Sequence, residues 1–494
     1  MAPNVCSSDL SGSSQKPLPK DLSELFVPSM RGPIKSAFKS VMGNPTLAMI
    51  NMAGGVPHPD TFPILRLQAT VRAPNGSDST GESALVLEKT TSSGSTESLN
   101  ELLQYGDGCG VDSYCRFLHK HAQRTHNPPY SGWGVIASCG NTDAIGKAVS
   151  LFCQPGDSIL VERWTFPGTL SSLGAAGVRP VPVALDGEGM IPEDLDQVCT
   201  AWSGSTPLRA VYLVPTGQNP TGATMSVARR KRIYAVAQKH NLAIIEDDPY
   251  YFLQLPSYGS SSDAGESRDS LLPSLLSLDA DGRVIRLDSF SKILAPNLRC
   301  GWITAPRYIL DKLQILNETT TLQPSGVSQG LISRLLNDAW GMDGWNAHLR
   351  QLRASYAQRR DLFVQMVDRH LSGLVEYAVP AAGMFLWMKI RFGPAADADP
   401  SVMSRLLEAM KKCGVMMAPG MPFSSTGPSP SDHYLRAAFA LVDVGMFEPA
   451  LIRLAQAIVA IRGISVCDSQ NEAKVQLALP AGSTTVASVN GTSR

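Results

Sequence analysis

A single lysine stands where an amine could act as a nucleophile. The mainly apolar run Val284–Leu287 predicts a buried strand, and Lys292 follows it in the company of two serines. A lysine in a pocket beside another cation has a lowered pKa, so its amine can form a Schiff base with a carbonyl compound. Ser289, Ser291 and Arg299 offer hydroxyls and a forked guanidinium that suit a phosphate group. An amine beside a phosphate cradle predicts pyridoxal phosphate as the cofactor.

An acidic group follows a second predicted strand, Leu242–Glu246. Asp247 comes directly after this strand. The pyridine nitrogen of such a cofactor must stay protonated for the ring to accept electrons, which requires a buried carboxylate, and Asp247 fits that role. A solvated turn or a metal site would also explain acidic residues at a strand end. No histidine lies nearby in the sequence to complete a set of metal ligands, so we predict no metal.

Two glycine-containing turns follow other predicted strands. Around Gly140 a strand passes into a helix, where backbone N–H groups and the helix N-terminus would favour a phosphate. An ordinary capped helix start explains the same residues equally well. The Asn-Pro-Thr-Gly sequence at 219–222 follows a buried strand and forms a turn by its chemistry alone. Both turns become candidate cofactor contacts only in the company of Lys292 and Asp247.

The elements that position these residues alternate between strand and helix from 134 to 305. Short β-branched or apolar runs predict strands at 135–137, 158–161, 178–185, 210–214, 242–246 and 284–287. Helical patterns lie between them, as at 143–152 and 227–240. Such alternation is typical of a mostly parallel sheet with helices on its faces. Ligands of these sheets bind at the carboxyl ends of the strands, and the candidates from Asn141 to Lys292 follow such ends.

The motifs resemble those of the aromatic amino-acid and kynurenine/α-aminoadipate aminotransferases, which are fold-type I pyridoxal phosphate enzymes. The resemblance spans about 31–461 and rests on four segments, namely Ser289-Phe290-Ser291-Lys292 with Leu298-Arg299, the turn at 219–222, the acidic segment 246–252 and the strand 434–439. It implies an α/β fold like that of aspartate aminotransferase. A large domain would hold a mostly parallel seven-stranded sheet sandwiched by helices, and a small α+β domain would follow at the C-terminal end.

The resemblance also implies a role for each candidate residue. Lys292 would hold the cofactor aldehyde and move the proton from the substrate Cα, and Asp247 would pair with the ring nitrogen. The other expected cofactor contacts are the phosphate ligands Asn141, Thr142, Ser289, Ser291 and Arg299, the stacking ring of Phe166, and Asn219 and Tyr250 at the phenolic oxygen. The expected substrate contacts are Arg436 at the α-carboxylate, Gly55 and Asn219. Tyr105 would reach the phosphate of a neighbouring subunit, which implies a homodimer with shared active sites.

This chain departs from the family at several of these positions. Asn141-Thr142 stands where the family usually has Ser-Gln, and Phe166 where it usually has tyrosine. We expect the chain to divide into a mobile N-terminal tail (1–28), a segment bordering the active site (29–70), a Ser/Gly/Thr-rich surface insertion suited to a hairpin (71–100), a large cofactor-binding domain (101–330), a small C-terminal domain (331–465) and a disordered tail (466–494).

Composition narrows the partners and the compartment. Lys+Arg and Asp+Glu both number 43 in the 494 residues, so nothing indicates nucleic acid as a partner. No run approaches the ~20 apolar residues of a membrane span, and no apolar stretch marks a secretory signal near the start. The nine cysteines are scattered without CxxC pairs, which is typical of reduced thiols in the cytoplasm.

The function implied is transfer of the amino group of an aromatic, or kynurenine- or 2-aminoadipate-type, L-amino acid to a 2-oxo acid such as 2-oxoglutarate. A pyridoxal phosphate lyase that acts by β-elimination, for example C–S cleavage in a secondary-metabolite pathway, is the alternative, since the same lysine serves both reactions. A transcription regulator with this fold would need a basic N-terminal module, but family-like sequence begins near Arg31. An inactive scaffold would be expected to have lost Lys292, Asp247 or Arg436, and all three are present.

Overall fold

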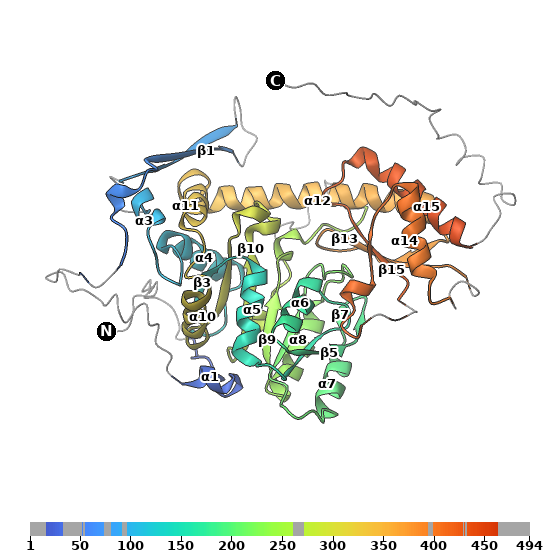
Figure 1. The fold of residues 1–494 in the computed structure, drawn as a ribbon, viewed down its shortest axis with the longest axis horizontal. Helices are drawn as coiled ribbons and strands as arrows, with labels where there is room; N and C mark the ends of the chain where they lie inside the picture. The colour runs from blue at the N-terminus through green and yellow to red at the C-terminus, as the bar shows by residue number, and fades with distance from the viewer. Residues whose placement is uncertain are drawn as a thin grey trace, which may run out of the picture.

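The computed structural model describes residues 16–32, 52, 55–73, 81–90, 96–259, 271–393, 399–427, 429 and 432–462. Two sheets organise these residues, and the long helix α12 (Gly341–Leu371) runs from the larger body toward the smaller one, as Figure 1 shows. The smaller body, coloured orange to red, carries the second sheet and the last helices (Figure 1). The chain thus has the large and small domains expected of the fold.

The large sheet has seven strands in the order β3-β11-β10-β9-β8-β4-β5. Their bounds are β3 (Trp133–Ser138), β4 (Ser158–Glu162), β5 (Arg179–Val183), β8 (Ala210–Leu213), β9 (Ala243–Asp247), β10 (Val284–Ser289) and β11 (Gly301–Pro306). All neighbours pair in parallel except β11, which is antiparallel to both β10 and β3. Six of these strands match the predicted runs. The seventh, β11, was not predicted, because a six-residue segment that begins with glycine and ends with proline lacks a strong strand signal.

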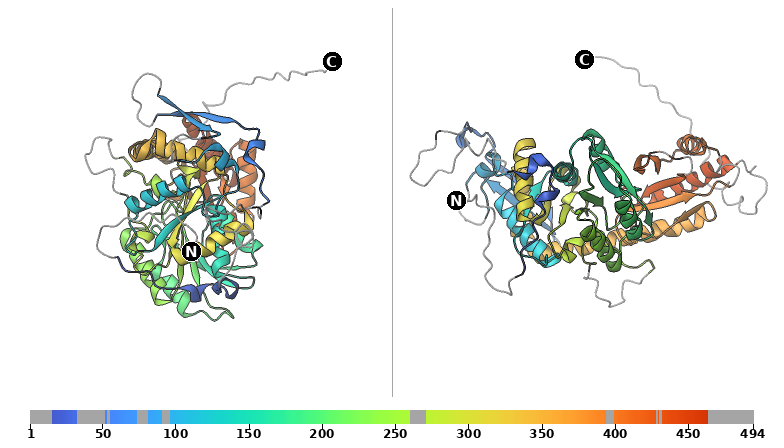
Figure 2. Two further views of the ribbon diagram at one scale, coloured as in Figure 1. Left: turned by 90° about the vertical axis from the view of Figure 1, so that its left-hand side faces the viewer. Right: turned by 90° about the horizontal axis from the view of Figure 1, so that it is seen from below.

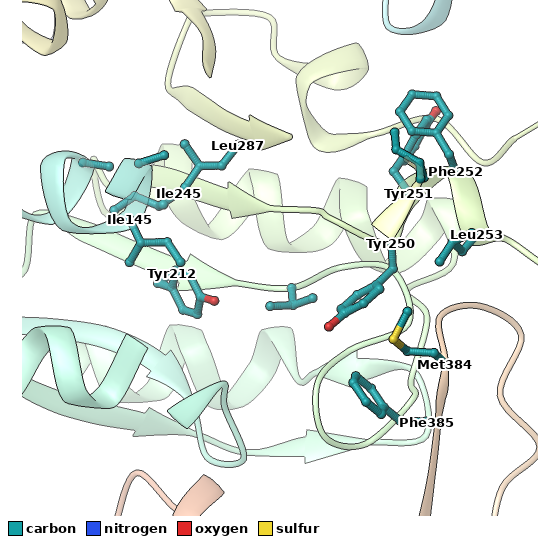
Figure 3. Packing of buried hydrophobic residues seen from close by; sticks show 14 of the residues in the cluster. Ile145, Tyr212, Ile245, Tyr250, Tyr251, Phe252, Leu253, Leu287, Met384 and Phe385 are labelled. Carbon is teal, nitrogen blue, oxygen red and sulfur yellow. The ribbon is translucent and has the colours of Figure 1, made fainter. Parts of the chain in front are cut away.

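Helices cover both faces of this sheet. They are α4 (Asp112–Thr125), α5 (Asn141–Phe152), α6 (Pro167–Ala175), α7 (Pro192–Thr200), α8 (Val227–Lys239), α9 (Leu275–Leu278), α10 (Arg307–Thr320) and α11 (Gly326–Arg334). Successive strand residues point to opposite faces, so Val211 and Ile244 pack with α8 while Tyr212 and Ile245 belong to the core around α5. Figure 3 shows Tyr212 and Ile245 close to Ile145 of α5. Burial of each large apolar side chain stabilises the fold by about 1.5–3 kcal/mol.

The small domain is built on an antiparallel sheet. Its four strands have the order β12-β13-β15-β14, with bounds β12 (Val375–Tyr377), β13 (Phe385–Ile390), β14 (Ala418–Pro419) and β15 (Tyr434–Ala438). Helices α14 (Val402–Cys413) and α15 (Phe447–Arg462) pack against each other, and α15 also packs against α12. Viewed from below, α12 links the two domains along one side (Figure 2).

The prediction of a mobile tail over 1–28 is wrong for residues 16–28. This stretch contains η1 (Ser23–Leu25) and the start of α1 (Pro28–Arg31), and Leu22, Phe26 and Val27 are buried. The Phe26 ring lies 5.8 Å from that of Phe152, and the Val27 N–H donates to the Leu151 carbonyl over 3.0 Å. The Ser, Pro and Lys content of the segment concealed a short apolar cluster. Residues 1–15 and the tail expected at 466–494 lie outside the described residues.

The expected surface insertion contains a hairpin that begins earlier than predicted. Strands β1 (Arg66–Arg72) and β2 (Glu82–Glu88) pair in antiparallel register, and α3 (Leu99–Leu103) follows. Leu87 is buried with Leu99 and Leu102. The hairpin lies at the outside of the large domain, against α11 (Figure 2). A short pair, β6 (Leu185–Asp186) and β7 (Gly189–Met190), completes the strands.

One helical stretch differs from the expectation that no segment could cross a membrane. Val444–Arg462 is long and apolar enough by length and composition, with a mean hydropathy of 1.5. Leu451, Leu454 and Ile458 in it are buried, and α15 packs against α12 and α14. One apolar face of this helix therefore belongs to the core of the small domain.

Candidate active site

Four chain segments converge at one edge of the large sheet. Lys292 ends the short helical turn η4 (Phe290–Lys292) after β10, and Asp247 is the last residue of β9. Asn141 begins α5 just beyond β3, and Asn219 lies in the loop after β8. Because β3, β8, β9 and β10 run in the same direction, their carboxyl ends meet at this edge.

Asp247 is a buried carboxylate held by two neutral donors. Asn141 Nδ2 donates to Asp247 Oδ1 and Tyr212 Oη donates to Oδ2, each over 2.6 Å. Burial raises the pKa of Asp247 to about 6, although the hydrogen bonds from Tyr212 and Asn141 and the charge of Arg286 act in the opposite direction. In the part of the chain that the structure describes, no cation forms an ion pair with this carboxylate. A protonated ring nitrogen would supply one.

The side chain of Asn141 is held by acceptors within the protein, and the predicted role of this residue with the phosphate stays a prediction. Its Nδ2 also donates to the Leu287 carbonyl over 3.1 Å, so both amide hydrogens are already used. Sequence reasoning placed Asn141 correctly at the helix start but could not see that Asp247 lies beside it. Thr142, one residue on, is exposed in the first turn of α5, and its role with the phosphate stays a prediction.

The expected phosphate ligands form a cluster around Arg299. Arg299 Nη1 donates to Ser291 Oγ over 3.3 Å, its Nη2 donates to the Cys139 carbonyl over 2.7 Å, and Ser289 Oγ donates to Ser291 Oγ over 2.9 Å. A Cβ on Gly140 would lie 2.4 Å from Arg299 Nη2, so glycine is needed for this close approach. The N-terminus of α5 lies at the same place. Hydroxyls, a guanidinium and helix N–H groups together suit a phosphate dianion.

Lys292 lies half-buried among cations. Burial lowers its pKa, and the charges of Arg436 and Arg299 lower it further. An amine beside another cation was expected from the sequence, and the structure brings two guanidiniums near Lys292. A larger fraction of this amine is neutral at physiological pH than of an exposed lysine, which is the state a nucleophile or general base needs.

Arg436 connects the small domain to the site. It lies on β15, and its Nη1 donates to Asn219 Oδ1 over 2.6 Å. Its guanidinium carbon lies 4.1 Å from the ring centroid of Phe385 and 4.8 Å from that of Phe423. Nε is buried without a hydrogen-bond partner among the described residues, and burial lowers the pKa of the guanidinium. Such a group offers unused donors to a carboxylate.

Two aromatic candidates lie near these groups. Tyr250 is buried, and its ring meets that of Phe385 edge to face at 5.8 Å, as Figure 3 shows. Burial and Asp247 raise the pKa of Tyr250, while Arg436 and a hydrogen bond with Asn219 oppose the change. Phe166 precedes α6 after the β4 strand and is partly buried.

Two predicted residues lie on exposed N-terminal segments. The Tyr105 side chain is 54% exposed, and Gly55 is exposed with open space where a side chain would begin. Gln104 Nε2 donates to the Pro57 carbonyl over 2.8 Å, which ties their two segments together. The predicted role of Tyr105 lies across a subunit interface and stays a prediction, as does that of Gly55.

Sequence reasoning missed Tyr212, Phe385 and Phe423. Tyr212 lies inside a strand that was predicted correctly. A polar tyrosine hydroxyl in a buried strand was the one sign in the sequence that it has a hydrogen-bond partner. Phe385 and Phe423 read as ordinary core residues. The pairing of β13 with β15 inside the small-domain sheet brings Phe385 to Arg436, and Phe423 reaches it from the loop between β14 and β15.

Comparisons with known proteins agree with this geometry. The family model of aminotransferase class I and II matches residues 76–454. An aromatic amino acid aminotransferase of Schizosaccharomyces pombe is 37% identical over 464 residues, which cover 88% of this chain and 97% of that protein. An L-tyrosine:2-oxoglutarate aminotransferase of Tapinella panuoides is 36% identical over 476 residues, which cover 83% and 90%. The crystal structure of aminotransferase Aro8 from Candida albicans matches with a TM-score of 0.84 and 34% identity, covering 91% of this chain and 100% of that one.

Class I and II aminotransferases depend on pyridoxal phosphate, and the residues of this site fit that cofactor. Among the described residues no cation pairs with Asp247, the hydroxyls around Arg299 suit a phosphate, and Gly140 admits the Arg299 guanidinium where a side chain would stand. Lys292 supplies an amine near Arg299 and Arg436. The chain belongs to the aminotransferase class I and II family.

Proposed function

We propose that this aminotransferase moves the amino group of an aromatic L-amino acid to a 2-oxo acid such as 2-oxoglutarate, with pyridoxal 5′-phosphate as its cofactor. Kynurenine and 2-aminoadipate are further donors within the proposal. The observation that carries it is the contact between Arg436 and Asn219 beside Lys292. This contact puts a carboxylate-binding guanidinium next to a lysine whose pKa is lowered, as reaction at an amino acid Cα requires.

The cofactor would be held at both ends. Asp247 would pair with the protonated ring nitrogen, while Ser289, Ser291, Arg299 and the N-terminus of α5 would bind the phosphate. The ring of Phe166 would cover one face, and Asn219 and Tyr250 would bond the phenolic oxygen. When bound, the cofactor supplies an aldehyde and an electron-accepting ring.

The residues of the chain then have separate tasks with the substrate. Arg436 binds the α-carboxylate through donors that Asn219 does not occupy, which fixes the direction of the Cα–H bond. The neutral Nζ of Lys292 would take the proton from the substrate Cα and deliver it to the C4′ carbon of the cofactor. Asn219 keeps the guanidinium in place from the large domain.

Aromatic surfaces near Arg436 support an aromatic donor. Phe385 and Phe423 flank its guanidinium, and Trp387, its cross-strand neighbour, stacks on Tyr434 with ring centroids 5.0 Å apart. Aromatic side chains prefer such surroundings by about 0.5–1.5 kcal/mol per ring pair beyond area burial. The names of the relatives from Schizosaccharomyces pombe and Tapinella panuoides point to the same class of donor.

The proposal includes a homodimer in the cytoplasm. The exposed Tyr105 would complete the phosphate site of the partner subunit, which would make each site depend on both chains. The cysteines in the described part of the chain are all free, in keeping with a reducing compartment.

The test is a half-reaction without an acceptor. Purified protein is mixed separately with tyrosine, phenylalanine, tryptophan, kynurenine and 2-aminoadipate, and the absorbance of the bound cofactor is followed. Conversion to the aminated form of the cofactor establishes transamination, and the rates rank the donors. Release of pyruvate and ammonia without that conversion would replace the proposal with β-elimination. Protein without cofactor absorbance, or unchanged absorbance after Lys292→Ala, would overturn it.

A further inference from the structure

We infer that Tyr212 is a positioning residue of this active site, which holds the Asp247 carboxylate in the orientation that meets the cofactor ring nitrogen. The inference rests on the proposed function, since it needs the cofactor to be bound at this carboxylate.

The strand register places the tyrosine at the right level. Tyr212 of β8 pairs with Ile245 of β9, so Asp247 lies one same-face repeat, about 7 Å, further along the sheet. The tyrosine ring spans this step, and its Oη donates to Asp247 Oδ2 over 2.6 Å. Figure 3 shows the Tyr212 ring near Ile245 of the sheet and Ile145 of α5. A phenylalanine would fill this space equally well, so packing alone does not explain the hydroxyl.

The two donors restrain the carboxylate from different sides. Asn141 approaches from the start of α5 and occupies Oδ1, whereas Tyr212 approaches from inside the sheet and occupies Oδ2. Both residues are neutral, so they orient the carboxylate without cancelling its charge. Burial and the neighbouring Asp247 raise the pKa of Tyr212, which therefore remains a donor at every working pH.

The neighbouring cation is held away from Asp247 by other acids. Arg286 Nη2 lies 2.8 Å from Asp288 Oδ1, and its Nη1 lies 3.1 Å from Glu246 Oε1 and from Asp248 Oδ2. Arg286 thus leaves the negative charge of Asp247 for a partner outside the protein. The hydrogen bond from Tyr212 then fixes the orientation of the Asp247 carboxylate.

The test is the variant Tyr212→Phe, titrated with pyridoxal 5′-phosphate after the cofactor has been removed. Loss of the hydroxyl leaves Oδ2 buried without a donor, so the cofactor Kd should rise about 10- to 100-fold. The pH below which binding weakens should also move upward, because a carboxylate with one donor fewer takes a proton more readily. Tyr114→Phe is the matched control, since its buried hydroxyl donates to the Gly301 carbonyl over 3.0 Å and does not touch Asp247.

A second variant protects the test against misfolding. Asn141→Ala removes the other donor at the start of a helix, outside the sheet, and should move the pH midpoint in the same direction. Wild-type Kd and pH midpoint in a folded Tyr212→Phe protein would overturn the inference, as would a wild-type midpoint in Asn141→Ala if Tyr212→Phe does not fold. A wild-type protein that binds no cofactor would instead contradict the proposed function itself.

Discussion

The two ends of the active site recognise charge in opposite ways. At one end Asp247 is a single carboxylate, 3% exposed, held by two neutral donors inside the sheet. At the other end the donors are Ser289, Ser291 and Arg299, together with the start of α5. Arg299 lies on a loop that reaches the surface. One end concentrates its charge in a buried carboxylate, and the other distributes its donors from the buried Ser289 to the exposed Arg299.

This difference predicts how much one residue can matter. A charge interaction that is worth about 1 kcal/mol in water becomes several times stronger where burial lowers the effective dielectric constant. Substitution at the Asp247 end should therefore cost far more than substitution of one phosphate donor. Four variants, from the largest expected effect to the smallest, test this rule.

Lys292→Ala should have the largest effect, because it removes the reacting amine between the two ends. We expect amino-transfer activity to fall by about 10²- to 10⁴-fold, the contribution typical of a general base. Cofactor binding should persist, since both ends remain. Steady-state rates with tyrosine and 2-oxoglutarate check this, with Lys239→Ala as the control, because Lys239 pairs with Asp196 on the surface. Activity within a few fold of wild type would contradict the assignment.

Asp247→Asn keeps the shape of the side chain but removes its charge. In the protein without cofactor, Asp247 is protonated below its pKa of about 6 and ionised above it. Cofactor affinity should therefore be highest above that pH and weaken as the pH falls through it, and the variant should lose this dependence. We expect kcat/KM to fall about 100-fold or more. Titration with cofactor from pH 5 to pH 8 checks the profile, with Asp311→Asn on the surface of α10 as the control.

Arg436→Lys tests how much a charged residue of the small domain contributes to substrate binding. The half-buried guanidinium would bind the substrate carboxylate through two donors, a geometry that an ammonium cannot reproduce, so KM for the amino acid should rise about 10- to 100-fold. Cofactor affinity should stay unchanged. Kinetics with several donors check this, and Arg405→Lys, in an exposed pair with Asp399, is the control. An equal loss of cofactor affinity would contradict the assignment of Arg436 to the substrate carboxylate.

Ser291→Ala should have the smallest effect, because Ser289, Arg299 and the helix N-terminus remain. We expect the cofactor Kd to rise about two- to tenfold, as for loss of one neutral hydrogen bond. Titration of the protein without cofactor measures it, with Ser150→Ala on α5 as the control. If Ser291→Ala weakened binding more than Asp247→Asn, the contrast between the two ends would be wrong.

The residues that sequence reasoning found are those whose chemistry is local. Asp247 ends a strand, and Lys292 and Asn219 lie in the segments that follow strands, so a parallel sheet was enough to bring them to one edge. The hydrogen-bond partners of Asp247 could not be predicted in this way. The contact of Asn141 with Asp247 was not predicted, and Tyr212 was not recognised, because these hydrogen bonds join positions far apart in the chain.

The apolar periodicity by itself predicted the mostly parallel sheet, and Lys292 with the acidic residue at the end of β9 predicted the cofactor, whereas the role of each site residue came from the family resemblance. Tertiary structure alone decided that β11 returns antiparallel, that residues 16–28 pack on the core, and that Arg436 meets Asn219 across the domains. The reason is physical: hydrophobic pattern and turn chemistry act over a few residues, whereas a buried carboxylate takes the donors that packing places beside it. The pairing of Asp247 with Tyr212 is a property of the sheet register.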